Sequence, residues 1–374
     1  MNSGKRKTFS VMMIALLVIM SLVLAACGST ATTTAATTAG TTAGTTAGTT
    51  AGTTVATTTA AKTWEPKEGI TMIVPYGAGG STDLLARAVE KVWSKHCDQP
   101  LTVAVKPGGG GVTGNLFVAN AKPDGYTIAI GFGSGSELVM PYVQPVQYKP
   151  FEQLRPIARI SIHSVAVAVP ENSPYKTMKD LVDDAKNNNK TLTAANSTAA
   201  GSVDFVMRGI GKRAGINVTP IPHSGGGPAT TTLLAGHTDF GGGHPAEIAA
   251  HLKSGKLRAL GIALPERDPA LPDVPTLKEQ GIDLATWGSV KGVAGPIGLP
   301  DEIVAYYEKL FKEICEDEEF KKTMQDMLQP VLYQDAKTFD KFLHDAFEDY
   351  KKLSDELGIK EAIAAEQAKP TTTK

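Results

Sequence analysis

The stretch VPYGAGGSTD, residues 74–83, decides the fold, because it has the composition of a turn between a strand and a helix. The run before it is short and β-rich, and apolar residues recur after it at helical spacing as far as Lys95. Glycines allow a sharp turn and the close approach of a ligand. The N–H groups and partial positive charge at the start of the following helix can bind a carboxylate without Arg or Lys. The alternative is that Ser81, Thr82 or Asp83 only caps the helix.

The same order of strand, glycine turn and helix recurs along the chain. Strands of a first block are expected at 69–75, 101–105 and 126–130. Strands of a second block are expected at 165–169, 192–195, 218–221, 238–240 and 257–262. Because helices are expected between them, this alternation favours parallel sheets with crossover helices. Three amphipathic helices are predicted to follow, at 301–317, 318–327 and 337–357.

Length and composition favour a soluble two-lobed protein over a nucleic-acid-binding one. The chain has 374 residues, which is too many for one compact core. Its 42% hydrophobic and 20% charged residues are ordinary for a soluble globular protein. Without the three basic residues at positions 5–7, the formal net charge changes from -1 to -4. No basic stripe suited to nucleic acid remains.

Residues 1–26 have the parts of a secretory signal peptide. A basic start at 5–7 precedes an apolar run at 11–24, and small residues follow. The run ends in LAAC, residues 24–27, which resembles the bacterial lipobox. That resemblance implies cleavage before Cys27 and a lipid on its sulfur, and so a lipid-anchored protein at the outer face of the cytoplasmic membrane. The alternatives are an uncleaved anchor, or a plain signal peptide with an accidental cysteine.

Residues 27–62 are expected to be a flexible tether that begins at the lipidated Cys27. From 28 to 61 the chain contains only Gly, Ser, Thr, Ala and one Val. Such a segment cannot bury enough apolar surface to offset its ordering entropy.

The two other cysteines, Cys97 and Cys315, either form a disulfide, as is common in an oxidising compartment, or are two unpaired, partly buried thiols.

Four further turns are candidates for ligand contact. Gly109, Gly111 and Gly114 formally match G-x-G-x-x-G, but the next strand has no acid at its tip, so tight packing is favoured over a dinucleotide site. The turn at 196–202 carries small hydroxyl groups that bind a ligand or cap a helix. In the turn at 222–228, His223 is either a ligand contact or a surface group. Asp239 precedes a run of three glycines.

Standard catalytic and metal-binding motifs are missing. The sequence contains no H-E-x-x-H, no C-x-x-C, no P-loop and no G-x-S-x-G elbow. His237, Asp239 and His244 do not fit the spacing of a standard metal site. We therefore expect no catalytic residue, no metal and no cofactor, and the alternatives to a binding protein are an exported hydrolase and a tethered surface scaffold.

The ordered set of motifs resembles the Bug, or TctC, family of substrate-binding proteins for tripartite tricarboxylate transporters. The resemblance is carried by residues 74–87, 106–111, 122–127, 155–159, 223–229, 255–260 and 271–276, in that order. It implies an α/β fold of the periplasmic-binding-protein type II, or Venus-flytrap, class, with two Rossmann-like lobes and a crossover hinge. It further implies a small organic acid as ligand and membrane transporter subunits as partners. One departure is His223-Ser224, where the family often has Tyr-Lys, and this makes a monocarboxylate, dicarboxylate or neutral ligand more plausible than citrate.

The resemblance assigns residues 63–164 and 286–374 to one lobe and 165–285 to the other. We expect a monomer that contacts the membrane through its N-terminal lipid and binds no nucleic acid. The ligand-binding residues implied by the resemblance are Tyr76, Gly77, Ala78, Gly79, Gly80, Ser81, Thr82, Asp83, Gly133, Ser134, Asn196, Ser197, Ser202, His223, Ser224, Gly225, Gly226 and Asp239.

Overall fold

Two separate β-sheets organise the part of the chain that the structure, a computed structural model, describes, which is residues 64–368. The predicted signal peptide at 1–26 and the tether at 27–62, with Cys27, lie outside these residues. Within residues 64–368, no helix is both long enough and apolar enough to span a membrane.

The first sheet has six strands in the order β11-β4-β10-β3-β1-β2. These strands are β1 (Ile70–Val74), β2 (Leu101–Val105), β3 (Thr127–Phe132), β4 (Leu154–His163), β10 (Ser289–Pro296) and β11 (Val331–Gln334). β1 runs parallel to β2 and β3, with Ile73 opposite both Ala104 and Ala129. β10 runs antiparallel to β3 and β4, and β11 antiparallel to β4.

The second sheet has five strands in the order β7-β6-β8-β5-β9. These strands are β5 (Ala166–Pro170), β6 (Thr191–Asn196), β7 (Asn217–Pro222), β8 (Phe240–Gly243) and β9 (Leu257–Ile262). β6 runs parallel to β7 and β8, whereas β5 runs antiparallel to β8 and β9. We call the first sheet with its helices the first lobe, and the second sheet with its helices the second lobe.

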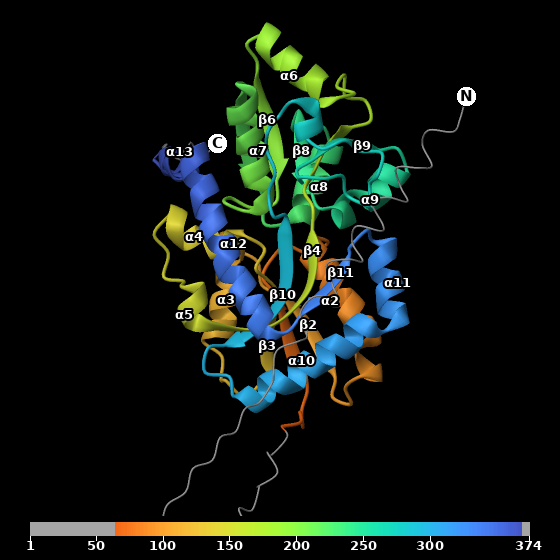
Figure 1. Cartoon of the computed structure of the whole chain (residues 1–374), viewed down its shortest axis with the longest axis vertical. Helices are drawn as coiled ribbons and strands as arrows, with labels where there is room; N and C mark the ends of the chain where they lie inside the picture. Colours follow the sequence, from red (N-terminus) through yellow and green to blue (C-terminus); the bar gives the residue numbers. More distant parts are fainter. Residues whose placement is uncertain (1–63, 369–374) are drawn as a thin grey trace, which may run out of the picture. The chain divides into compact units, whose positions relative to one another are not determined.

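Helices cover both faces of each sheet (Figure 1). The helices of the first lobe are α2 (Ser81–Val92), η1 (Trp93–Lys95), η2 (Gly109–Gly111), α3 (Val112–Ala119), α4 (Ser136–Val143), α5 (Pro150–Gln153), α10 (Asp301–Glu316), α11 (Glu318–Asp326), α12 (Ala336–Leu357) and α13 (Ile359–Gln367). Those of the second lobe are α6 (Met178–Asn187), α7 (Ser202–Ala214), α8 (Gly226–Leu234), α9 (Pro245–Lys253) and η3 (Lys278–Gln280).

Each sheet has apolar side chains on both faces, as expected for a sheet covered by helices on both sides. Successive side chains of a strand point to opposite faces, so Met72 and Ile73 of β1 belong to different clusters. In β5, Val167 packs with α6 and α7, and Ala166 and Ala168 pack on the opposite face with α8 and α9. The continuous apolar runs of these strands therefore follow from burial on both faces.

Two chain crossings connect the lobes, and Figure 1 shows β4 and β10 side by side where they occur. The last residue of β4, His163, is opposite the first residue of β10, Ser289. The chain passes from β4 to the second sheet after His163 and returns to the first sheet at Ser289. The lobe boundaries drawn from the sequence stay a prediction.

The sheets differ from the sequence prediction in being mixed and not wholly parallel. β4, β10 and β11 were not among the predicted strands, and neither α4, α9 nor α13 was among the predicted helices. β10 has the sequence SVKGVAGP, in which a lysine and two glycines interrupt the pattern of a strand. The predicted strand at 238–240 begins two residues later, as the glycine-rich β8.

Of the two alternatives for Cys97 and Cys315, the structure shows two unpaired thiols and not a disulfide. Both are buried in the same apolar cluster of the first lobe. The Tyr306 hydroxyl lies 3.6 Å from the Cys97 sulfur. Burial raises the pKa of the Cys315 thiol to about 12, so this side chain stays neutral at physiological pH.

Candidate functional site

A small polar cavity lies between the lobes and is lined by both of them. Its space for water-sized molecules is about 30 Å³, enough for about two waters but not for an organic acid. The lining residues of the first lobe and its crossing strand are Tyr76, Gly80, Ser81, Thr82, Ser134, Ser289 and Lys291. The lining residues of the second lobe are Ser197, Thr198, Gly201, Ser202, Gly225, Gly226, His244 and Glu247.

Four helices begin at this cavity, one from the first lobe and three from the second. The N-cap residues of α2, α7, α8 and α9 are Gly80, Gly201, Gly225 and His244. The three glycines have no side chain that could satisfy the first N–H groups of their helices. The partial positive charges of these helix ends therefore add up around one cavity, which favours an anion.

The glycine turns of the two lobes touch beside the cavity. The N–H of Gly77 donates a 2.7 Å hydrogen bond to the Ser224 carbonyl oxygen. A Cβ atom on Gly225 would lie 2.7 Å from the Gly77 nitrogen, and one on Gly227 would lie 2.5 Å from the Ala78 oxygen. Only glycine permits this approach, so these residues let the lobes close.

Lys291 of β10 places a buried ammonium group at the cavity. Its side chain is 2% exposed, and Nζ donates to Thr82 Oγ1 at 3.0 Å and to Ser134 Oγ at 3.3 Å. Burial lowers the pKa of Lys291 to about 8, although Glu247 and Glu137 act to raise it. The group is therefore mostly protonated at neutral pH.

Glu137 of α4 fixes the turn that follows β3. Its Oε1 accepts hydrogen bonds from the N–H groups of Gly133 and Ser134, at 2.6 and 2.7 Å, and its Oε2 accepts one from the Tyr76 hydroxyl. Burial raises the pKa of Glu137, although these hydrogen bonds and Lys291 act to lower it. Gly131, which lies in β3 just before this turn, has φ +89°, and a Cβ atom on it would collide with Thr82 Cγ2.

Glu247, in the first turn of α9, links the two lobes through backbone hydrogen bonds. Its Oε1 accepts from the N–H of Ser81 at 2.9 Å, and its Oε2 accepts from the N–H of His244 at 3.0 Å. Burial acts to raise the pKa of Glu247. His244 and these two amides act more strongly to lower it, so the net shift of the pKa is downward. Glu247 is therefore ionised at neutral pH.

Two buried histidines lie next to each other where the lobes meet. The rings of His163 and His244 are 5.8 Å apart between centroids. His244 Nδ1 lies 2.9 Å from the Ser164 carbonyl oxygen, whereas neither ring nitrogen of His163 has a hydrogen-bond partner within the described residues. Burial lowers the pKa of both, helped by Lys291, so both rings are neutral at physiological pH.

The structure brings half of the residues named from the sequence into the cavity wall. These are Tyr76, Gly80, Ser81, Thr82, Ser134, Ser197, Ser202, Gly225 and Gly226. Gly77, Ala78, Gly79 and Ser224 belong to the contact between the glycine turns.

The other named residues support the site or lie elsewhere. Asp83 Oδ2 accepts from the N–H of Gly79 at 2.9 Å, one residue before the N-cap Gly80, and no side chain among the described residues caps α2. Asn196 Nδ2 donates to Asp204 at 2.8 Å, and His223 lies within hydrogen-bond distance of the Asn196 carbonyl oxygen, at 3.1 Å. Asp239 is outside this cavity, because it bonds Thr193 and forms a 2.8 Å ion pair with Lys190.

Four lining residues were not predicted from the sequence, namely His244, Glu247, Ser289 and Lys291, whereas Thr198 and Gly201 belong to the predicted turn at 196–202. A signal existed for three of the four. His244-Pro245-Ala246-Glu247 has Pro at the first helical position and Glu at the third, which is typical of a helix start. Lys291 is a lone cation in an apolar segment.

Within residues 64–368, no group of three His, Cys, Asp or Glu side chains could hold a metal ion.

Two α/β lobes, joined by crossing strands and enclosing a polar cavity, define the class of two-lobed solute-binding proteins. Residues 85–359 match the tripartite tricarboxylate transporter family receptor, TctC, and the chain belongs to this family. Both the family and the two-lobed α/β fold predicted from the motifs are thereby confirmed. The protein is a solute-binding receptor.

Individual relatives agree with this assignment. The UPF0065 protein in gbd 5'region of Cupriavidus necator is 29% identical over 302 residues, which cover 79% of this chain and 90% of that protein. The periplasmic binding protein BugD is similar in structure with a TM-score of 0.74 at 24% identity, over 79% of this chain and 99% of that one. MatC of Rhodopseudomonas palustris, solved with bound malate, has a TM-score of 0.71 at 24% identity, over 77% and 99% of the two chains.

Proposed function

We propose that the cavity between the lobes binds a small organic acid through its carboxylate and that the protein delivers this acid to the membrane subunits of a tripartite transporter. The observation that carries the proposal is the meeting of four helix N-termini and the buried ammonium group of Lys291 at one cavity. The helix ends and Lys291 supply positive charge there, and α7 and α8 also supply N–H donors, because the first N–H of α2 already bonds Glu247.

The available donors fit a carboxylate in number and in kind. Ser202 and Gly226 are the first residues of α7 and α8, so their N–H groups have no acceptor within their own helices. Lys291 and the hydroxyl group of Thr82 line the cavity from the first lobe, whereas the Ser134 hydroxyl already donates to the backbone carbonyl oxygens of Gly131 and Val290. A carboxylate has two oxygens that accept several hydrogen bonds, and it would therefore bond both lobes at once.

Ligand entry requires the lobes to separate, because a cavity of about 30 Å³ does not hold an organic acid. The two crossings next to His163 and Ser289 are the segments about which such a movement would occur. The acid then stabilises the closed arrangement by bonding both lobes, and closure is the state that the transporter would recognise. The malate bound to MatC supports the choice of an acid as ligand.

The protein is proposed to release its ligand chemically unchanged. Membership in a family of receptors supports this proposal, and so does a cavity wall in which the polar groups bond each other or the backbone. We further propose that the protein is a monomer that works outside the cytoplasm and is held at the membrane by a lipid on Cys27. The leader and the LAAC sequence support this part.

A binding screen tests the proposal. The full-length chain, in detergent, is titrated by calorimetry with monocarboxylates, dicarboxylates, amino acids and uncharged amides of the same size. An acid is expected to bind and to raise the melting temperature, and mass spectrometry should recover it unchanged. Lys291→Met should weaken acid binding about 10–100-fold, because it removes a charge-assisted hydrogen bond. The exposed Lys309→Met is the matched control. Binding of the amides at the affinity of the acids would refute the proposal.

A further inference from the structure

Glu247 occupies an anion position that a ligand carboxylate would otherwise take. The first N–H of α2, that of Ser81, points at Glu247 Oε1 from the opposite lobe, at 2.9 Å. The carboxylate lies directly against Gly226, since a Cβ atom there would collide with both of its oxygens. The side chain is only 9% exposed and still lines the cavity. The protein therefore places its own carboxylate at the N-terminus of α2.

The charges around the cavity leave room for one further carboxylate. Lys291 is the only Lys or Arg among the described residues that line it, and it faces two buried carboxylates, Glu137 and Glu247. Burial lowers the pKa of His163 and His244, so neither ring contributes positive charge at neutral pH. A second ligand carboxylate would meet no cation and would lie near Glu247, where like charges repel strongly because water is excluded.

Glu247 can also accept a hydrogen bond from a ligand. A carboxylate oxygen accepts about two hydrogen bonds, and each oxygen of Glu247 accepts one, from Ser81 or from His244. The remaining acceptor capacity suits a hydroxyl or an ammonium group. Such a donor must be within reach of Glu247 while the ligand carboxylate contacts Lys291 and the helix ends of the second lobe.

We infer that Glu247 determines the charge of the ligand, so that the site selects acids with a single carboxylate and a neighbouring hydroxyl or ammonium donor over dicarboxylates. This inference rests on the proposed function and names the substrate class of the same cavity. The geometry on which it depends is the pair of hydrogen bonds that hold the Glu247 carboxylate between α2 and α9.

Matched probe ligands test the inference on the full-length chain. Calorimetry is carried out with lactate and alanine, which have one carboxylate and a donor, with propionate, which lacks the donor, and with succinate and malate, which have two carboxylates. Lactate or alanine is expected to bind at least 10-fold more tightly than propionate, succinate or malate. This comparison needs no variant and does not depend on how a substitution affects folding.

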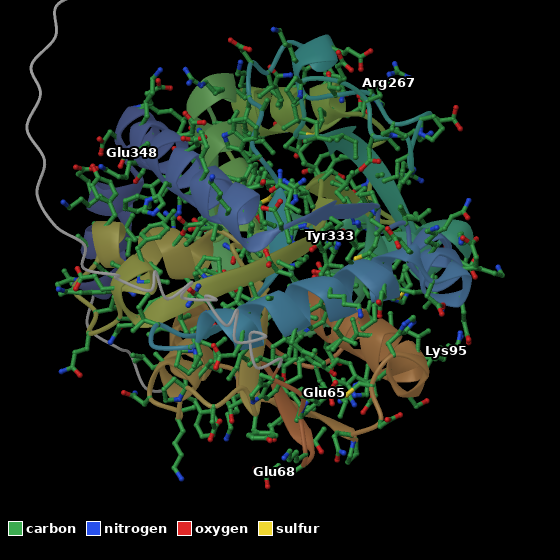
Figure 2. All side chains as sticks on the ribbon, turned by 60° about the horizontal axis from the view of Figure 1, so that its bottom comes forward. Glu65, Glu68, Lys95, Arg267, Tyr333 and Glu348 are labelled. Atoms are coloured by element: carbon green, nitrogen blue, oxygen red, sulfur yellow. The ribbon has the colours of Figure 1, made fainter. Side chains whose placement is uncertain are left out.

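Glu247→Gln should then invert the preference. The amide removes the negative charge, so the affinity for succinate or malate is expected to rise at least 10-fold while that for lactate or alanine falls. Glu68→Gln is the matched control, since Figure 2 shows Glu68 at the outer edge of the first lobe and its side chain is exposed. This control should leave every affinity unchanged. The melting temperature of each variant establishes that it is folded.

The outcomes separate the inference from the proposed function. If the wild-type chain binds succinate or malate at least as tightly as lactate and alanine, or if folded Glu247→Gln keeps the wild-type order, the inference is overturned and the proposed function stands. If no acid of either class binds, both are overturned. The expected order in the wild-type chain, together with its inversion in Glu247→Gln, supports both.

Discussion

The N–H of Gly77 donates a 2.7 Å hydrogen bond to the carbonyl oxygen of Ser224, and this contact joins the glycine turns of the two lobes. It lies next to the residues that line the polar cavity, so the contact that closes the lobes also closes the site. Closure and ligand binding are therefore expected to depend on the same few glycines.

Gly225→Ala should prevent full closure. The added Cβ atom would lie 2.7 Å from the Gly77 nitrogen, which is backbone and cannot move aside as a side-chain end can. We expect a larger radius of gyration by small-angle scattering and an acid affinity at least about 10-fold weaker. Gly298→Ala, whose Cβ would make only ordinary contacts at 3.6 Å, is the control. An alanine variant that closes and binds like the wild type would argue against this role of the glycine turns.

The titration of Lys291 predicts opposite pH dependences for binding and for stability. Burial lowers its pKa from 10.5 to about 8, so the cation that attracts the acid is lost as the pH rises through 8. Affinity should therefore fall above this pH, by up to about tenfold per unit. The free energy of unfolding of the unliganded chain should instead rise between 8 and 10.5, because the unfolded state holds the proton more tightly there.

Calorimetry and chemical denaturation at several pH values between neutrality and about pH 10 measure both effects. Lys291→Met should abolish the two pH dependences together, whereas Lys309→Met should preserve them, because Lys309 is an exposed residue of α10. An acid affinity that stays constant across this range in the wild-type chain would show that Lys291 is not the cation of the site.

Tyr76→Phe should destabilise the first lobe. The Tyr76 hydroxyl donates to the fully buried carboxylate of Glu137, which in turn holds the N–H groups of Gly133 and Ser134. Removing this donor is expected to cost about 1–3 kcal/mol of unfolding free energy. Tyr142→Phe removes a 2.6 Å hydrogen bond to the exposed Asp355 and should cost less than about 1 kcal/mol. Equal losses in the two variants would contradict the structural importance of Glu137.

The sequence predicted the glycine turns and the binding of an acid at helix N-termini, but it did not predict the charged side chains of the site. The stretch 74–83 gives a local signal, since the turn and the helix that follows it are specified by neighbouring residues. Lys291 and Glu247 act on that turn from positions far along the chain, and only the folding of β10 and α9 brings them there. The chemical type of Asp239 likewise suited a ligand contact, but its ion pair with Lys190 lies in another part of the second lobe.

The thiols should behave as buried and unpaired. Cys97 and Cys315 are both in the core, and burial raises the pKa of Cys315 to about 12. Peptide mass spectrometry after iodoacetamide treatment should find both unmodified in the native chain and both modified after unfolding without reductant. Recovery of a cross-linked peptide pair from the unfolded, unreduced chain would contradict the structure on this point.

The most direct measurement is a crystal structure of the full-length chain with its tightest-binding acid. The ligand carboxylate is expected to lie between the lobes, within hydrogen-bond distance of Lys291 Nζ and of the N–H groups of Ser202 and Gly226, with the acid chemically intact. An acid bound away from Lys291, or one that contacts only a single lobe, would contradict it.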